Sequence, residues 1–335
     1  MSSDLPINKN KAPEDKVLDQ TLRPSSFNEY IGQENIKNNL SILLKAARGR
    51  NHAPEHILFY GSPGLGKTTL AYLIAKEIGA QMKVTSGPAI ERVGDLASIL
   101  TNLSPGDILF IDEIHRLNKS VEEILYPAME SGQMDIIVGK GPAARTIQLD
   151  LPPFTLIAAT TRVAMISSPL RSRFSGGVFK LEFYTDTEIQ SIVERSAKIL
   201  DISLDSKAAK YIAERSRKTP RTANYLLKRC RDLAQIYEKS LDEDIVIEAL
   251  NMIGTDKAGL NKSDVDLLET IIKKYHGGPV GLSTIAASLS EDEATIEDFN
   301  EPYLIQLGFL DRTPRGRIVT ELAYNHLNIP YTKNE

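Results

Sequence analysis

The chain has 335 residues, more than one hydrophobic core normally holds, so two or three domains are expected. Hydrophobic residues make up 41% and charged residues 25%, an ordinary composition for a soluble protein with a sizeable core, and no apolar run predicts a transmembrane helix. The formal net charge of −4 excludes nucleic-acid binding through overall charge, so any such contact requires a local basic patch.

The N-terminal segment, residues 1–20, is polar and is expected to be a flexible tail. It lacks the apolar stretch of a secretory signal. The single cysteine, Cys230, cannot form an internal disulfide and lies in a helical pattern, which favours a buried, unreactive thiol. No cysteines and histidines have zinc-ligand spacing. Together these features favour the cytoplasm and no membrane.

The first large unit, residues 21–184, alternates helical patterns with short β-branched runs. The runs His56–Tyr60, Ile108–Ile111 and Thr155–Ala159 are almost entirely apolar. Such strands, separated by helices, are typical of a parallel sheet covered on both faces. The sequence therefore predicts an α/β domain.

A glycine-rich segment follows the first of these strands. Residues 61–68 fit the pattern G-x-x-x-x-G-K-[ST], and the apolar spacing after them predicts a helix. The backbone N–H groups of Gly64, Leu65 and Gly66 would face phosphate at the start of this helix. Lys67 would reach the β- and γ-phosphates, and Thr68 would bind Mg²⁺. An accidental glycine-rich turn is the alternative, which the flanking strand and helix make improbable.

Two carboxylates, Asp112 and Glu113, end the second apolar strand. The carboxyl edge of a parallel sheet would place them beside the phosphate loop. Asp112 would then hold Mg²⁺, and Glu113 would orient the attacking water. By itself, an acidic pair after a strand is often a solvated helix start, so this interpretation depends on the phosphate loop.

Three later features are less specific. Thr161 follows the third strand, where a hydroxyl could contact γ-phosphate or water, although a simple turn is at least as common. Arg171 and Arg173 lie on one short segment, where surface arginines are the usual interpretation. Arg221 lies in the first turn of a predicted helix that Thr219 and Pro220 open.

The remaining chain divides into two smaller units. Residues 185–254 show only helical spacing, which predicts a small helical bundle. Residues 255–335 predict three short helices and then a hairpin, the outline of a winged helix. The hairpin tip carries Arg312, Arg315 and Arg317, and Pro314 and Gly316 favour a turn that keeps these arginines exposed. We expect them to contact DNA phosphates, with a solvated loop as the alternative.

Taken in order, these motifs resemble the AAA+ ATPases and, more closely, the RuvB family of Holliday-junction branch-migration motors. The likeness extends from Leu22 to Leu327. It rests on the segments Phe27–Gln33, Gly64–Leu70, Thr85–Pro88, Phe110–Leu117, Gly141–Arg145, Leu151–Thr161, Leu181–Tyr184 and Thr313–Arg317.

The resemblance implies a P-loop ATPase domain with a parallel sheet, a small helical lid domain and a C-terminal winged-helix domain. It implies that Thr161 is the first sensor and that Arg173 is an arginine finger, which reaches into a neighbouring subunit's ATP. Tyr184 and Arg221 would contact nucleotide where the ATPase and lid domains meet. The base pocket would consist of Leu22, Arg23, Tyr30 and Ile31, and the phosphate and Mg²⁺ site of Gly64, Lys67, Thr68 and Thr69.

The resemblance also implies partners. Members of the family work as a homohexameric ring on the duplex arms of Holliday-junction DNA. They bind RuvA through a hairpin, which here corresponds to residues 135–149, and RuvC cuts the junction. Ile136, Val138, Ile147 and Leu149 are the candidate apolar contacts to RuvA.

The chain departs from the family pattern at Ser62, which replaces a usual proline, at Ser175-Gly176-Gly177, which replaces a shorter turn, and at Glu130-Ser131-Gly132, which replaces a usual Glu-Asp.

Two other functional classes share parts of this pattern. A replication initiator or clamp-loader-like ATPase would switch state with ATP rather than move DNA, and a protein unfoldase would act on polypeptide. The segments 141–145 and 313–317 favour the DNA motor over the initiator. The winged helix and the absence of an N-terminal substrate domain disfavour the unfoldase.

Overall fold

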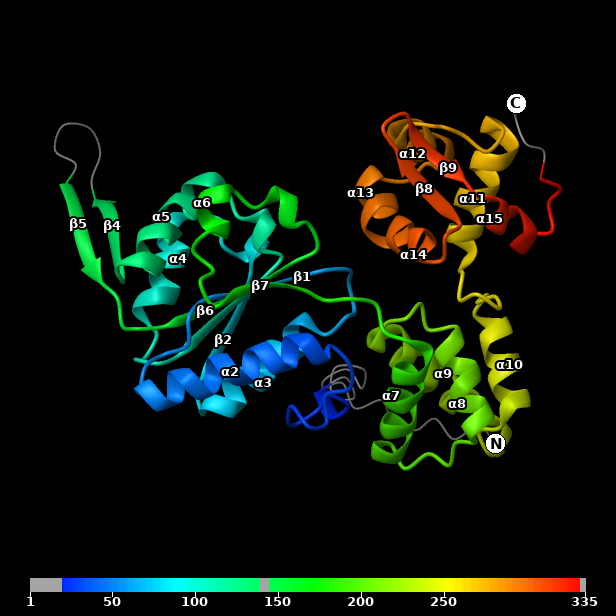
Figure 1. The fold of residues 1–335 in the computed structure, drawn as a ribbon, viewed down its shortest axis with the longest axis horizontal. Helices are drawn as coiled ribbons and strands as arrows, with labels where there is room; N and C mark the ends of the chain where they lie inside the picture. The colour runs from blue at the N-terminus through cyan, green and yellow to red at the C-terminus, as the bar shows by residue number, and fades with distance from the viewer. Residues whose placement is uncertain (1–19, 139–144, 332–335) are drawn as a thin grey trace, which may run out of the picture.

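The computed structural model describes residues 20–138 and 145–331 (Figure 1). Residues 1–19 of the expected tail and 139–144 of the expected hairpin lie outside this part. Within the described residues, none of the helices combines the length and the apolar character needed to cross a membrane.

A five-stranded sheet forms the centre of the first unit, and neighbouring strands are parallel. The predicted apolar strands are confirmed as β1 (Ile57–Tyr60), β3 (Ile108–Asp112) and β6 (Thr155–Thr160). Sequence reasoning missed the two edge strands, β2 (Met82–Ser86) and β7 (Gly177–Lys180), which give the order β2-β3-β6-β1-β7. Both are only partly buried, so neither has the apolar run that identified the central strands.

Helices cover both faces of this sheet (Figure 1). Because successive side chains of a strand point to opposite faces, Ile57 and Phe59 join one core cluster and Leu58 joins another. The first cluster includes α2 (Glu34–Arg50) and α3 (Lys67–Ile78). The second cluster includes residues of α4 (Val93–Thr101), α5 (Lys119–Glu130) and α6 (Ser168–Arg171).

A two-stranded hairpin, β4 (Gln133–Val138) and β5 (Arg145–Asp150), projects away from this unit (Figure 1). The predicted hairpin is thus present, but two of the four residues expected to dock on a partner are partly buried within the chain itself. Ile136 and Leu149 are partly buried against the core beneath α5, because Met134, on the same face, anchors the hairpin there. Ile147 remains 47% exposed, and the Val138 side chain lies outside the described part.

The second unit is the predicted helical bundle, and it shares a continuous core with the sheet's α2–α3 face. Thr185 and Thr219 cap two of its helices by accepting from the backbone N–H of Glu188 and Thr222. Cys230 is fully buried, as predicted, and burial raises the pKa of its thiol to about 12. The helices are α7 (Asp186–Ile199), α8 (Ser206–Glu214), α9 (Pro220–Tyr237) and α10 (Glu243–Met252).

The C-terminal unit has its own core and the predicted order of helices and hairpin. The third predicted helix begins with one π-helical turn, Ile296–Asn300, which lies between α13 (Glu293–Thr295) and α14 (Glu301–Gln306). The other elements are α11 (Lys262–Tyr275), α12 (Leu282–Leu289), β8 (Leu310–Thr313), β9 (Gly316–Val319) and α15 (Glu321–His326).

The prediction that Arg317 lies exposed at the hairpin tip is wrong. Its side chain is buried, and its Nε donates to Glu301 Oε1 at 2.6 Å. The reason is strand pairing, which places Arg317 opposite Arg312 on the face that packs against α14. Arg312 is exposed but pairs with Glu297 at 3.0 Å, while Arg315 is exposed at the turn.

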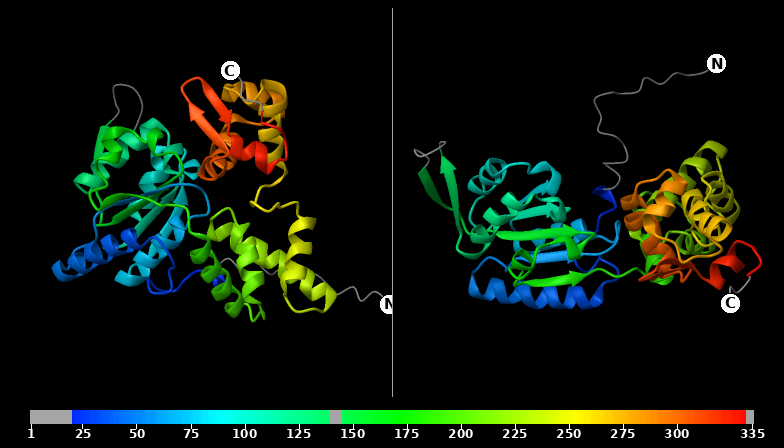
Figure 2. Two further views of the ribbon diagram at one scale, coloured as in Figure 1. Left: turned by 45° about the vertical axis from the view of Figure 1, so that its right-hand side comes forward. Right: turned by 90° about the horizontal axis from the view of Figure 1, so that it is seen from above.

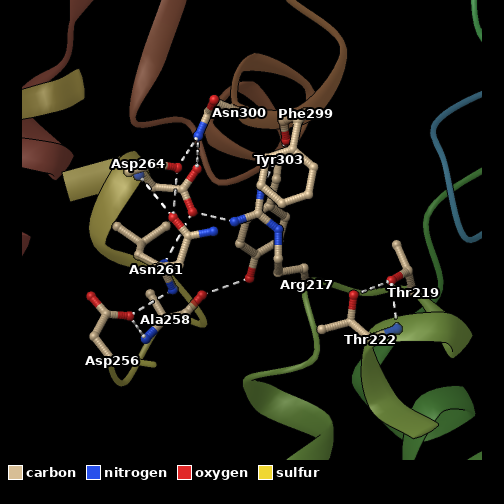
Figure 3. A network of polar contacts seen from close by, with 12 residues as sticks. Arg217, Thr219, Thr222, Asp256, Ala258, Asn261, Asp264, Phe299, Asn300 and Tyr303 are labelled. Carbon is tan, nitrogen blue, oxygen red and sulfur yellow. Dashed lines mark hydrogen bonds and ion pairs between the residues drawn. The ribbon is translucent and has the colours of Figure 1, made fainter. Parts of the chain in front are cut away.

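A buried polar network joins the lid unit to the winged helix (Figure 3). The guanidinium of Arg217, which follows α8, forms an ion pair with the fully buried carboxylate of Asp264 in the first turn of α11. Its other amino group donates to the Phe299 carbonyl at 2.9 Å, and Asn300 Nδ2 donates to Asp264 at 2.8 Å. Every charge in this network therefore has a partner, which a buried ion pair requires.

We predict that Arg217→Met lowers the free energy of unfolding by about 3 kcal/mol, because Asp264 is left as a buried charge without its cation. Differential scanning calorimetry measures this change. The matched control is Lys273→Met, which removes the exposed pair with Glu269 and is expected to cost less than about 1 kcal/mol. Equal shifts in melting temperature for both variants would show that the Arg217 pair is not important for stability.

Candidate nucleotide-binding site

A cavity of about 280 Å³ lies between the carboxyl edge of the sheet and the helical unit. Such an edge is where ligands bind in open α/β sheets. The walls come from the N-terminal segment, the start of α3, the ends of β3 and β6, and helices α7 and α9. The lining residues are Leu22, Arg23, Pro24, Glu29, Tyr30, Ile31, Pro63, Gly64, Gly66, Lys67, Thr68, Thr69, Asp112, Glu113, Thr161, Tyr184, Ile192, Arg195, Pro220, Arg221 and Asn224.

The phosphate loop requires its glycines because other groups lie directly against it. A Cβ on Gly66 would lie 2.7 Å from the Tyr30 hydroxyl, and one on Gly64 would lie 3.0 Å from the Arg221 Cβ. Both glycines also have positive φ, +102° and +81° respectively. The loop is therefore fixed from one side by the N-terminal segment and from the other by α9.

Lys67 begins α3 and points back into the loop. Its Nζ donates to the carbonyl oxygens of Gly61 at 2.7 Å and Ser62 at 2.9 Å. Burial lowers the pKa of Lys67 to about 8, an effect that the carboxylate of Asp112 opposes and the cation of Arg221 reinforces. An anion in the cavity would raise the pKa of Lys67 back towards its ordinary value. The site therefore favours phosphate oxygens next to this ammonium group.

The acidic pair lies where the sequence predicts, at the end of β3. Asp112 Oδ1 accepts from the Glu113 backbone N–H at 2.9 Å, and both residues line the cavity. Glu113 has a φ of 49°, a left-handed conformation that is uncommon for a residue with a side chain and frequent at functional sites. This turn directs the chain away from the strand, and the Glu113 carboxylate forms an exposed pair with Arg116 at 3.2 Å.

The end of β6 supplies the predicted hydroxyl. Thr161 lines the cavity, whereas the neighbouring Thr160 is buried and contacts His115 Nδ1 at 2.9 Å. Burial lowers the pKa of His115, which favours a neutral imidazole beside this hydroxyl. Through this contact, His115 joins the ends of β3 and β6.

Two buried tyrosines, Tyr30 and Tyr184, line the cavity and also contact the backbone of the phosphate loop. Tyr184 donates from its hydroxyl to the Leu65 carbonyl at 3.2 Å, and its hydroxyl also lies 3.0 Å from that of Tyr30. Burial raises the pKa of Tyr184 to about 12, so the hydroxyl remains a donor. The Leu65 side chain belongs to the core, so the predicted contribution of this residue to the site can come only from its backbone.

The cavity is also lined by residues that sequence reasoning missed. Arg195 on α7 donates to the Leu22 carbonyl at 3.0 Å, and Asn224 on α9 accepts from Ser196 at 2.7 Å. Burial lowers the pKa of Arg195. In the sequence, Arg195 is recognisable only as an arginine within the apolar face of α7, near Ile192. It belongs to no motif of the phosphate loop.

Arg173, the predicted finger, lies outside this cavity. Its guanidinium donates to the Pro169 carbonyl at 2.7 Å and to Glu130 at 2.8 Å. Arg173 lies on the surface segment after α6. In the same segment, Gly176, which belongs to the turn that departs from the family pattern, lies close to the backbone of Glu55. The chain's own cavity therefore lacks this arginine, and Glu130, from the segment that departs from the family pattern, is its partner here.

Three family models match the chain in succession. The model of the Holliday junction DNA helicase RuvB P-loop domain matches residues 22–180. The RuvB AAA lid domain matches residues 184–256, and the RuvB C-terminal winged helix domain matches residues 257–328. Each match coincides with one of the three units described above.

Similar proteins agree with these matches. The Holliday junction branch migration complex subunit RuvB of Dehalococcoides mccartyi (strain CBDB1) is 57% identical over 323 residues, which cover 96% of this chain and 92% of that protein. The Thermotoga maritima RuvB Holliday junction branch migration motor superposes with a TM-score of 0.86 and 49% identity, over 93% of this chain and all of that one. A mutant of the same Thermotoga protein gives a TM-score of 0.87 over 92% of this chain and 100% of its own. This chain belongs to the RuvB family of AAA+ P-loop ATPases.

Proposed function

We propose that this chain is the ATP-driven motor that moves DNA during branch migration of Holliday junctions. One observation supports this most directly: a phosphate-loop cavity and a winged helix occur on one chain, and all three of its parts match RuvB models. We divide the chain into an ATPase domain (21–184), a lid domain (185–254) and a winged-helix domain (255–335), preceded by the tail (1–20).

ATP binding would depend on the charges around the phosphate loop. Lys67 and Arg221 both reach the cavity, one from the ATPase domain and one from the lid. The start of α3 adds the partial positive charge of its free backbone N–H groups. Leu22, Arg23, Tyr30 and Ile31 lie in the N-terminal wall, which suits an adenine base, and Thr69 lies beside the phosphate end. Because the lid contributes to the cavity, nucleotide binding would also fix the angle between the two domains.

The donor set fits magnesium. Among the described residues, no three His, Cys, Asp or Glu side chains could hold a metal alone. Thr68 and Asp112, however, line one cavity and offer a hydroxyl and a carboxylate oxygen. Mg²⁺ commonly binds through so few protein ligands because phosphates and waters complete its shell. Bound there, it would neutralise charge on the phosphates.

Hydrolysis would be divided between subunits. Glu113 and Thr161 lie in the same cavity as Lys67 and would orient the attacking water. Arg173 would act on the neighbour's ATP, since it lies outside its own cavity. Its pair with Glu130 does not oppose this role strongly, because the two side chains are 28% and 67% exposed and such pairs contribute only about 0–1 kcal/mol.

The partners follow from the family. We propose a homohexameric ring that encircles the duplex arms of Holliday-junction DNA, with RuvA bound at the 135–149 hairpin and RuvC as the nuclease. The exposed face of Ile147 is the described apolar position of that hairpin most open to a partner. A motor on chromosomal DNA would work in the bacterial cytoplasm.

The distinguishing experiment compares stimulation of ATP hydrolysis by three substrates. We expect junction DNA with RuvA to stimulate more than linear duplex, and unfolded protein to have no effect. Strongest stimulation by unfolded protein would favour an unfoldase, and DNA binding without translocation would favour an initiator. Electron microscopy with junction DNA and ATP would show whether a ring surrounds the duplex.

The first site prediction separates binding from turnover. Lys67→Ala should abolish ATP binding, because the phosphates lose their buried cation. Glu113→Gln should retain ATP affinity but hydrolyse about 10²–10⁴ times more slowly, because water is no longer activated. Calorimetric affinities and steady-state turnover test both. The control, Glu91→Gln, removes an exposed charge outside the cavity and should change neither. Parallel loss of affinity and turnover in Glu113→Gln would contradict the assigned role.

The second prediction concerns the action of Arg173 in trans. Arg173→Ala should bind ATP yet lose about 10³–10⁵ in turnover, the usual contribution of an arginine finger. Mixing it with Lys67→Ala should restore part of the activity, since one subunit then supplies the finger and the other the pocket.

The control for this experiment is Arg171→Ala, an exposed arginine on the same segment, which should behave as wild type. If Arg171→Ala shows the defect instead, the finger is assigned to the wrong residue. If mixed rings form and no ratio restores activity, action in trans is excluded.

The third prediction concerns DNA contact by the wing. Arg312→Ala and Arg315→Ala should each reduce the slope of log affinity against log salt by about one, equally on any duplex sequence. Arg317→Ala should instead lower thermal stability, because Glu301 is only 2% exposed and would lose its ion pair. Duplex titrations at several salt concentrations, with melting curves, distinguish the two effects. A sequence-selective loss would indicate base recognition.

A further inference from the structure

The π-helical turn Ile296–Asn300 lies where the three domains meet. In Figure 2, the region of α13 and α14 faces the ATPase domain, while α11 continues from the lid. Asp298 contacts the ATPase domain, Phe299 and Asn300 belong to the network with the lid, and Glu297 contacts the wing. π-Helical turns are rare and occur often at functional sites.

The contact with the lid is buried. Arg217 lies between Asp264, Phe299 and Tyr303, with its guanidinium 4.7 Å from the centre of the Tyr303 ring (Figure 3). The Asp264 side chain is fully buried and that of Arg217 is 11% exposed. Opening this contact would leave a charge without a partner inside the protein, which is strongly unfavourable. The lid and the winged helix should therefore move together.

The contact with the ATPase domain is different because water reaches it. Nε of Arg162 donates to both carboxylate oxygens of Asp298, at 2.7 and 2.9 Å, and Nη2 lies 3.4 Å from Glu297. These side chains are 24–34% exposed. When the charges separate, water can solvate each of them, so this contact can open and close at much lower cost than the buried one.

Arg162 connects this contact to the nucleotide cavity. It directly follows Thr161, which lines the cavity, and its backbone N–H donates to Thr160 at 2.9 Å. Its backbone is therefore fixed to the end of β6. Any displacement of Thr161 when phosphate binds or leaves would move the Arg162 guanidinium relative to the winged helix.

Glu297 connects the same contact to the wing. Its carboxylate lies 3.4 Å from Arg162 and 3.0 Å from Arg312, one of the arginines that we expect to contact DNA. One carboxylate thus interacts with two arginines from different domains. If Arg162 withdraws, Arg312 is the remaining partner of Glu297, so the net charge that acts on Arg312 changes.

We propose that the Arg162–Asp298 contact is a releasable joint through which the nucleotide site and the DNA-binding wing affect each other. The joint rests on the proposed function, because it presumes that the cavity binds ATP and that the wing binds DNA. Arg162 acts here as a positioning residue. By thermodynamic linkage, whatever factor nucleotide imposes on DNA affinity, DNA imposes on nucleotide affinity.

The test measures duplex DNA affinity of the full chain with ADP and with a non-hydrolysable ATP analogue. Wild type should bind duplex DNA with different affinities in the presence of ADP and of the ATP analogue. Asp298→Asn should reduce the ratio of these two affinities by at least about fivefold, towards one. Asp298→Glu, which keeps the charge, should restore much of the ratio. Glu291→Gln is the matched control, because it removes an exposed carboxylate of the same domain that forms no ion pair among the described residues.

The DNA-free ATPase activity of Asp298→Asn should equal that of wild type, since Asp298 does not line the cavity. This readout and a melting curve distinguish lost coupling from lost folding. If wild type shows the ratio and Asp298→Asn keeps it, the joint is wrong and the proposed function stands. If Glu291→Gln loses the ratio equally, overall charge is responsible and the joint is again wrong. If wild type binds no duplex, both proposals fail.

Discussion

The close packing of Tyr30 and Arg221 against bare glycines is the contact on which the site depends. Because Gly66 and Gly64 carry no side chain, the N-terminal segment and the lid both reach the phosphate loop. The Leu65 carbonyl then accepts hydrogen bonds from buried tyrosines, which hold the loop from behind. A side chain at either glycine would separate these parts and open the cavity.

The same arrangement controls the charges in the cavity. Burial lowers the pKa of Lys67 to about 8, and the nearby cation of Arg221 adds to this effect, so the ammonium group gains more from a phosphate partner than an exposed lysine would. The carboxylates of Asp112 and Glu113 approach from the sheet edge, and Arg221 approaches from α9. In a site that uses both domains to balance its charges, a bound nucleotide would contact the ATPase domain and the lid together.

The winged helix extends this linkage because its two contacts differ in burial. The Arg217 network excludes water and attaches the winged helix to the lid, whereas the Arg162 contact is partly solvated. Burial decides the difference, since an opened surface pair is solvated and an opened buried pair is not. A single chain thus combines a stable attachment with one that can open.

The sequence alone determined those features that depend on neighbouring residues. Continuous apolar runs identified the central strands, and the spacing of glycines, Lys67 and Thr68 identified the phosphate loop, because local geometry needs those residues there. The edge strands β2 and β7 were missed because half-exposed strands carry no such run. Only the tertiary structure could decide that Arg317 pairs with Glu301, that Ile136 and Leu149 are already packed, and that Arg195 lines the cavity. The sequence pattern around a charged side chain does not show whether that side chain faces water or a buried partner. The packing of segments that are distant in the sequence determines which of the two occurs.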